Sequence, residues 1–170
     1  MSLDKNILKD KLQTIQDNKP LSIDEAAKAW SDAIFSYISA ATIKNITNPI
    51  IDNPGRDFML PVFDQQLLED SFLSSLNSST FVDDLGNNLS AIFSSAIWNK
   101  SSTIPEQENI TVEIFDLLIF DTSTLSQSLS NEKTSENISI ILSDSIDEWT
   151  RSIQVKITLS GGQTSNRFIF

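Results

Sequence analysis

The sequence contains no cysteine and no histidine among its 170 residues. The lack of cysteine excludes disulfides, thiolate zinc sites and cysteine nucleophiles. The lack of histidine excludes a Ser-His-Asp triad, an imidazole general base and any metal held by histidine. The sequence therefore lacks two residue types on which many hydrolases and metalloproteins depend.

Glycine, proline and positive charge are also scarce. Only four glycines and five prolines occur, which disfavours long flexible linkers and turn-dense β-sandwiches. Twelve Lys and Arg residues stand against 23 Asp and Glu residues, so the formal net charge is −11. Because the basic residues are scattered, nucleic acids and anionic membranes would be repelled, and we expect neither as a partner.

Long hydrophobic runs are absent as well. No apolar run approaches the roughly 20 residues that a membrane helix needs. The opening MSLDKNILKDKLQ alternates charged and apolar side chains, unlike a signal peptide. A chain of this length can bury roughly 68–70% of its unfolded surface in its own core. We expect a single domain, 1–170, which could divide into two lobes: 1–104, mainly helical, and 105–170, mixed helix and strand.

Apolar residues recur at helical spacing in several segments. The clearest is 23–41, which follows Ser22 and has Glu25 three residues later, the pattern of a capping box. Further helices are predicted at 3–17 and within 60–77, the second with Pro61 in its first turn. Another is predicted over 81–97, after a cap at Ser79 or Thr80. The last follows a cap at Ser135 and has an apolar stripe from Ile138 to Ile153.

Short strands are expected near 42–47, 110–118 and 153–159, where β-branched and polar residues alternate. The run LLIF at 117–120, which follows the alternating part of the second, has no period. Loops are expected at 48–57 and 101–109, and the polar stretch 122–137 reads as a surface excursion. The predicted class is α+β, predominantly helical, with four or five helices. The predicted core comprises Trp30, Ile34, Tyr37, Leu89, Ile92, Ile146 and Trp149.

Two segments resemble each other: SDAIFSYISAATIK at 31–44 and SDSIDEWTRSIQVK at 143–156. A third, SAIFSSAIWNKSSTI at 90–104, shares Ala-Ile-Phe-Ser with the first. A repeated helix–strand unit would explain the similarity. Amphipathic helices in a chain rich in Ser and Ile would also resemble one another without any repeat. The uneven spacing argues against a solenoid of fixed period.

No motif carries catalytic chemistry. Adjacent acidic pairs such as Asp147-Glu148 lie on predicted helices, where neighbouring side chains point in different directions and cannot form a dyad. Phosphate-binding loops, dinucleotide fingerprints and EF-hand spacing are absent from the sequence. We therefore predict no enzyme activity, no catalytic residues, no cofactor and no metal site.

The N-terminal quarter carries one resemblance. MSLDKNILKDKLQTIQDN and then SIDEAAKAWSDAIFSYISAATIKN, with Ala27, Asp32-Ala33-Ile34 and Tyr37 in register, resemble small virion structural proteins of tailed phages. The Lys, Asn, Ile and Ser bias looks like that of T4-like phages of marine cyanobacteria. The resemblance covers about residues 1–46 and implies a head, neck, tail or baseplate component, located in the virion or the host cytoplasm. It carries no catalytic residue across.

Two functions are compatible with these observations. The first is a non-enzymatic structural or assembly protein that packs against itself or other virion proteins, as a homo-oligomer. The second is a small acidic soluble module that binds or regulates an unidentified partner. For assembly, the wide apolar stripe of 23–41 and the apolar C-terminal end provide a candidate interaction surface: Phe35, Arg167, Phe168, Ile169 and Phe170. That end could join a sheet edge within the chain or in another subunit.

Overall fold

The computed structural model describes residues 3–41, 43, 61–76, 81–98, 111–158, 162 and 164–169. Six helices lie in these ranges: α1 (Lys5–Asn18), α2 (Ile23–Ile38), α3 (Gln65–Leu76), α4 (Phe81–Ser95), α5 (Thr122–Ser130) and α6 (Ser135–Ser152). Five strands accompany them: β1 (Pro61–Val62), β2 (Ile97–Trp98), β3 (Thr111–Asp116), β4 (Gln154–Thr158) and β5 (Thr164–Phe168). The predominantly helical α+β class is therefore confirmed.

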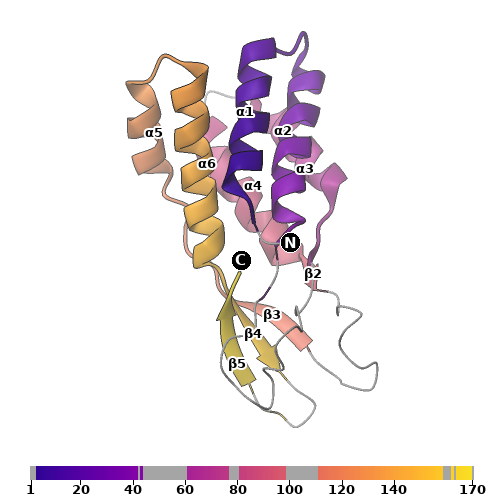
Figure 1. Cartoon of the computed structure of the whole chain (residues 1–170). Coiled ribbons are helices and arrows are strands. Elements are labelled where there is room, and N and C mark those ends of the chain that lie inside the picture. Colours follow the sequence, from indigo (N-terminus) through magenta and orange to yellow (C-terminus); the bar gives the residue numbers. More distant parts are fainter. Residues whose placement is uncertain are drawn as a thin grey trace.

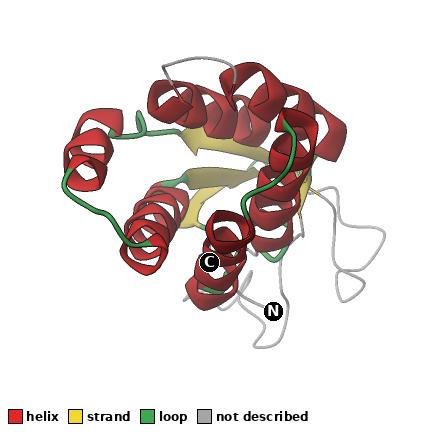
Figure 2. Ribbon diagram, turned by 90° about the horizontal axis from the view of Figure 1, so that it is seen from above, coloured by secondary structure: helices red, strands yellow, loops and turns green. Residues whose placement is uncertain are grey.

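The helices form a ring in sequence order. Each helix packs against the next, and α6 returns to pack against α1. Figure 2 shows this arrangement from above, with α5 at one side of the ring. Because amphipathic helices turn their apolar stripes toward a shared centre, the ring encloses one hydrophobic core that draws residues from α1 to α6.

A small antiparallel sheet extends from one end of the ring (Figure 1). Its strand order is β3-β4-β5, and α6 enters it directly, since Ser152 ends the helix and Gln154 begins β4. The register pairs Val112 with Ile157 and Ile114 with Val155, which places four apolar residues on one face. The opposite face carries polar partners such as Glu113 and Lys156, joined by an ion pair of 3.2 Å. The sheet therefore continues the core on one face only.

Local signals set the helix boundaries. Ser22 caps α2 as predicted, because its hydroxyl accepts the amide of Glu25 at 3.2 Å. The Glu25 carboxylate accepts the amide of Leu21 at 2.9 Å, one residue before the cap. At α6 the cap is Thr134, whose hydroxyl accepts the amide of Asn137, so the expected cap at Ser135 is off by one residue.

Three predicted element assignments were wrong. The polar stretch 122–137 contains a sixth helix, α5, so the expected count of four or five was too low. Pro61 lies in β1, paired with Trp98, rather than in the first turn of a helix. Ile97 belongs to β2, and α4 ends at Ser95. In each case a tertiary partner or a nearby cap determined the local structure.

The predicted core residues are all buried: Trp30, Ile34, Tyr37, Leu89, Ile92, Ile146 and Trp149. The stripe of α2 is covered within the chain, since Ala33, Ile38 and Ala41 are also buried. The chain's own helices cover this stripe, because α1 and α3 flank α2 and the ring closes over it.

Strands occur at two of the three expected places. β3 falls within 110–118 and β4 within 153–159. Of the expected strand 42–47, only Ile43 is described, and it forms a bridge with Ile169. The predicted loops 48–57 and 101–109 and the cap at Ser79 or Thr80 lie outside the described residues. Within the described ranges, no helix is both long and apolar enough to cross a membrane.

Candidate interaction surface

The structure does not bring the predicted surface residues together. Phe35 is partly buried and packs against the core. Ile169 is fully buried, and its amide donates to the carbonyl of Ile153 at 3.3 Å. Arg167 is partly buried opposite Val155, and Phe170 lies outside the described residues. The C-terminal end therefore joins a sheet within the chain, and of the predicted residues Phe168 alone is described as exposed.

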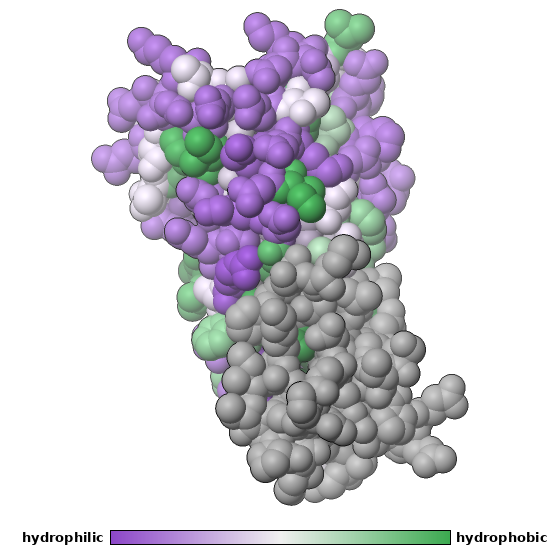
Figure 3. All heavy atoms as spheres, in the orientation of Figure 1, coloured by the Kyte–Doolittle hydropathy of each residue, from purple (hydrophilic) through white to green (hydrophobic). Residues whose placement is uncertain are grey.

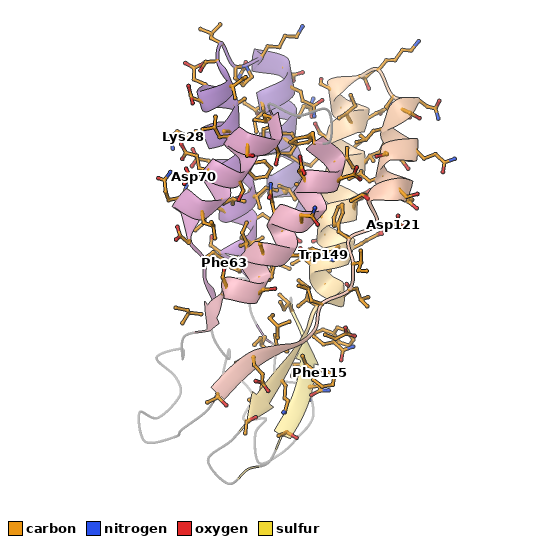
Figure 4. The ribbon with its side chains drawn as sticks, turned by 180° about the vertical axis from the view of Figure 1, so that it is seen from behind. Lys28, Phe63, Asp70, Phe115, Asp121 and Trp149 are labelled. Carbon is orange, nitrogen blue, oxygen red and sulfur yellow. The ribbon has the colours of Figure 1, made fainter. Side chains whose placement is uncertain are left out.

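Phe168 and a second exposed phenylalanine, which the sequence prediction missed, lie on the two edge strands at the same end of the sheet. The register pairs Gln154 of the central strand with Phe168 on one side and Asp116 on the other. Phe115 precedes Asp116 at the irregularity in β3 and lies at the level of the sheet in Figure 4. Phe115 is 57% exposed and Phe168 is 48% exposed. We call these two residues the phenylalanine pair.

Beyond β3 the chain crosses toward α5 and presents two further apolar side chains. Leu118 is 51% exposed and Ile119 is 95% exposed. Phe120 points the other way and is buried, with its ring edge-to-face with Trp149 at a centroid distance of 5.7 Å. We call Leu118 and Ile119 the ridge. It is the exposed half of an apolar run whose other half is anchored in the core.

Three contacts fix the ridge in place. The indole Nε1 of Trp149 donates to the carbonyl of Leu118 at 2.7 Å. Asp121 caps α5, and its carboxylate accepts the amide of Thr124 at 2.9 Å and the Thr124 hydroxyl at 2.7 Å. The third is close packing: α4 approaches the crossing so closely that a Cβ on Gly86 would lie 3.0 Å from Phe120 Cβ. These contacts hold the chain in place on both sides of Ile119.

Hollows lie on both sides of the ridge. On the side of α5 and α6, a hollow of about 240 Å³ is lined by Leu125, Trp149 and Ser152 along with the ridge. On the side of α4, a hollow of about 470 Å³ is lined by Gly86, Asn87 and Ser90 along with the ridge. Leu118, Ile119 and Phe120 line both hollows. The ridge therefore stands between two depressions into which a partner's side chains could extend.

The charges around the ridge have one sign. The charged residues that line the two hollows are Asp83, Asp121 and Glu148, and all three are exposed. Hydrogen bonds from Thr124 hold the pKa of Asp121 below its ordinary value, so its carboxylate stays ionised at neutral pH. Figure 4 labels Asp121 and Trp149, which lie on the same side of the ring. The surface combines an apolar centre with an acidic rim.

A buried polar network between α2 and α6 is the other candidate for chemistry. The Tyr37 hydroxyl donates to Asp147 Oδ1 at 2.5 Å, and Arg151 Nε donates to Asp147 Oδ2 at 2.8 Å. Arg151 also donates to the carbonyl of Leu3 at 3.0 Å. Burial and then the bond to Asp147 raise the pKa of Tyr37 far above its ordinary value of 10.0. A phenol that holds its proton this firmly is neither a base nor a nucleophile, so the network fastens the N-terminal segment to the ring.

Adjacent acidic residues behave as the sequence predicted. Asp147 points into the network, whereas its neighbour Glu148 is exposed and lines a hollow beside the ridge. In the described part of the chain, no three acidic side chains converge closely enough to hold a metal ion.

Comparison with known proteins finds no matching family model, no similar curated protein and no similar solved structure. The evidence on function therefore comes from the residues themselves. The helical face in Figure 3 is mainly hydrophilic with separate hydrophobic spots. Phe115, Leu118 and Ile119 are exposed apolar residues that lie along β3 and its exit.

One sequence signal could have located the ridge. LLIF at 117–120 is an apolar run without a period, and such a run cannot place all its side chains on one buried face. Leu117 and Phe120 pack inward, and the two residues between them are left outside. The aperiodicity was visible in the sequence, but which residues are buried depends on Gly86 and Trp149, which are remote along the chain.

Proposed function

We propose that this chain is a non-enzymatic structural protein that assembles by packing against other protein subunits, its own copies included. The observation that carries the proposal is the phenylalanine pair, two half-exposed aromatic rings at one end of a sheet. Aromatic side chains are enriched at the centres of protein interfaces and supply much of the binding energy there. The resemblance of residues 1–46 to small virion structural proteins supports a place in a phage particle.

The association state of variants tests this proposal. We expect the wild type to associate with increasing concentration, and the double substitution Phe115→Ser with Phe168→Ser to weaken association by about tenfold or more. Leu21→Ser is the matched control, because Leu21 is 94% exposed and lies in the turn between α1 and α2, at the other end of the ring.

Sedimentation velocity of the three proteins, with circular dichroism to check their folding, provides the measurement. An association constant that is unchanged in a folded double variant would remove the phenylalanine pair from the interface. A wild type that sediments as a monomer throughout would favour the alternative, an acidic binding module.

A further inference from the structure

We propose that the ridge and its two hollows form a docking site for a cationic amphipathic segment of a different protein, one that presents apolar side chains flanked by Lys or Arg. The proposal rests on the proposed function only in that the chain acts through protein contacts. It concerns Leu118 and Ile119, whereas self-assembly was assigned to Phe115 and Phe168.

The geometry favours an extended apolar contact. Ile119 is almost fully exposed, and the hydrogen bond from Trp149 to the Leu118 carbonyl keeps its backbone in position. A rigid apolar projection loses little conformational entropy on binding, which makes it a suitable centre for an interface. The hollow on one side of the ridge is lined by Trp149 and Leu125, and the hollow on the other side is lined by Gly86. A partner side chain could therefore be buried on each flank of the ridge.

The charge identifies the kind of partner. Asp83, Asp121 and Glu148 surround the ridge, and neither hollow is lined by Lys or Arg. A second copy docked ridge to ridge would bring three carboxylates of each subunit together without a cation from these linings. Complementary charge on the partner would relieve this repulsion and steer association.

A synthetic peptide provides the probe. Fluorescein-labelled peptide of alternating Leu and Lys blocks, with helical spacing, is titrated with the full chain, and anisotropy gives the dissociation constant. The matched peptide has Glu in place of every Lys. We expect the Lys peptide to bind, with affinity that falls as salt is added, and the Glu peptide to bind at least about tenfold more weakly.

Variants separate a site from general charge attraction. Ile119→Asp should weaken Lys-peptide binding about tenfold or more, whereas Leu21→Asp, at a residue that is equally exposed, should leave it unchanged. Glu148→Gln should weaken binding and reduce its salt dependence. Asp24→Asn makes the same change of charge in the first turn of α2, at the other end of the ring. It should change neither the affinity for the Lys peptide nor its salt dependence.

Three results would overturn the proposal. The first is equal binding of the two peptides, and the second is equal loss of binding in Glu148→Gln and Asp24→Asn. The third is loss of self-association in Ile119→Asp, which would make the ridge a contact between copies of this chain. Failure of the assembly proposal is recognised separately, because that proposal is tested by the self-association of the Phe115 and Phe168 double variant, without any peptide.

Discussion

The single tyrosine of the chain, Tyr37, bonds two helices across the core. Its hydroxyl is bonded to Asp147, which is largely buried, and removal of either partner leaves the other without this bond. Tyr37→Phe should lower the free energy of unfolding by about 1–3 kcal/mol, because the Asp147 oxygen loses its donor in a largely buried site. Urea unfolding of the two proteins measures this difference.

The raised pKa of Tyr37 predicts how stability depends on pH. An unfolded tyrosine ionises near pH 10, while the folded one keeps its proton. Above pH 10 the unfolded state therefore binds fewer protons than the native state, and the free energy of unfolding falls by up to about 1.4 kcal/mol per pH unit. Below pH 10 this contribution is fully present.

Phenolate absorbance near 295 nm follows this titration directly, since the chain has one tyrosine. We expect phenolate to form only where the circular dichroism signal of the fold is lost. Ionisation of Tyr37 near pH 10 in a chain that remains folded would contradict the buried network.

Trp149 links the core to the ridge. Its ring meets Phe93 and Phe120 edge-to-face, and its Nε1 holds the Leu118 carbonyl. Trp149→Ala should cost about 3–5 kcal/mol through lost packing and the cavity that remains. Trp149→Phe keeps most of the ring packing and removes the N–H, so it should cost about 1–3 kcal/mol. A loss under 1 kcal/mol for Trp149→Ala, measured by urea unfolding, would mean that the residue is exposed.

Among the secondary-structure elements, α4 depends on a glycine for its position. In an isolated helix, alanine at position 86 would be favoured by up to about 1 kcal/mol. Here the added Cβ would meet Phe120 at 3.0 Å and Thr122 at 3.1 Å, both close to the backbone of the crossing segment. Overpacking of this kind costs about 1–3 kcal/mol, so Gly86→Ala should destabilise the chain despite the gain in helix propensity.

Thermal unfolding of Gly86→Ala decides between these two effects. A midpoint below that of the wild type would agree with the close contact. A midpoint above it would show that helix propensity dominates and that α4 and the crossing segment are packed more loosely than described.

The elements that the sequence predicted correctly are those with a clear period. α2 and α6 carry wide apolar stripes and recognisable caps, and both were found with their core residues. α5 was missed because its nine residues are mostly Ser and Thr, which have modest helix propensity, with Leu125 and Leu129 as its apolar pair. The Asp121 cap and packing against α4 and α6 stabilise it.

The start of α3 was misplaced for a similar reason. Pro61 is a favourable first residue for a helix, yet it pairs with Trp98 in a short ladder. The helix begins after Asp64, whose carboxylate accepts the amide of Leu67 at 3.1 Å. The side-chain cap at Asp64, three residues later, was the better signal, and the partner strand of Pro61 could not be predicted from the local sequence.

For the molecule as a whole, the sequence predicted the class but not the arrangement. Helical periodicity tells which face of a helix is buried, but it does not tell which neighbour covers that face. The contact between α1 and α6, which closes the ring, is therefore a finding of the structure. The same limit explains the candidate site: burial of Ile169 and the α2 stripe required partners that are distant in sequence.

The molar mass of the wild-type chain in solution tests the assembly proposal most directly. Multi-angle light scattering after size exclusion, over a series of loading concentrations, gives this mass without a label or a variant. The proposal predicts a mass above the 18.9 kDa of a single chain, either as a fixed oligomer or rising with concentration. A mass of 18.9 kDa at every concentration would contradict it.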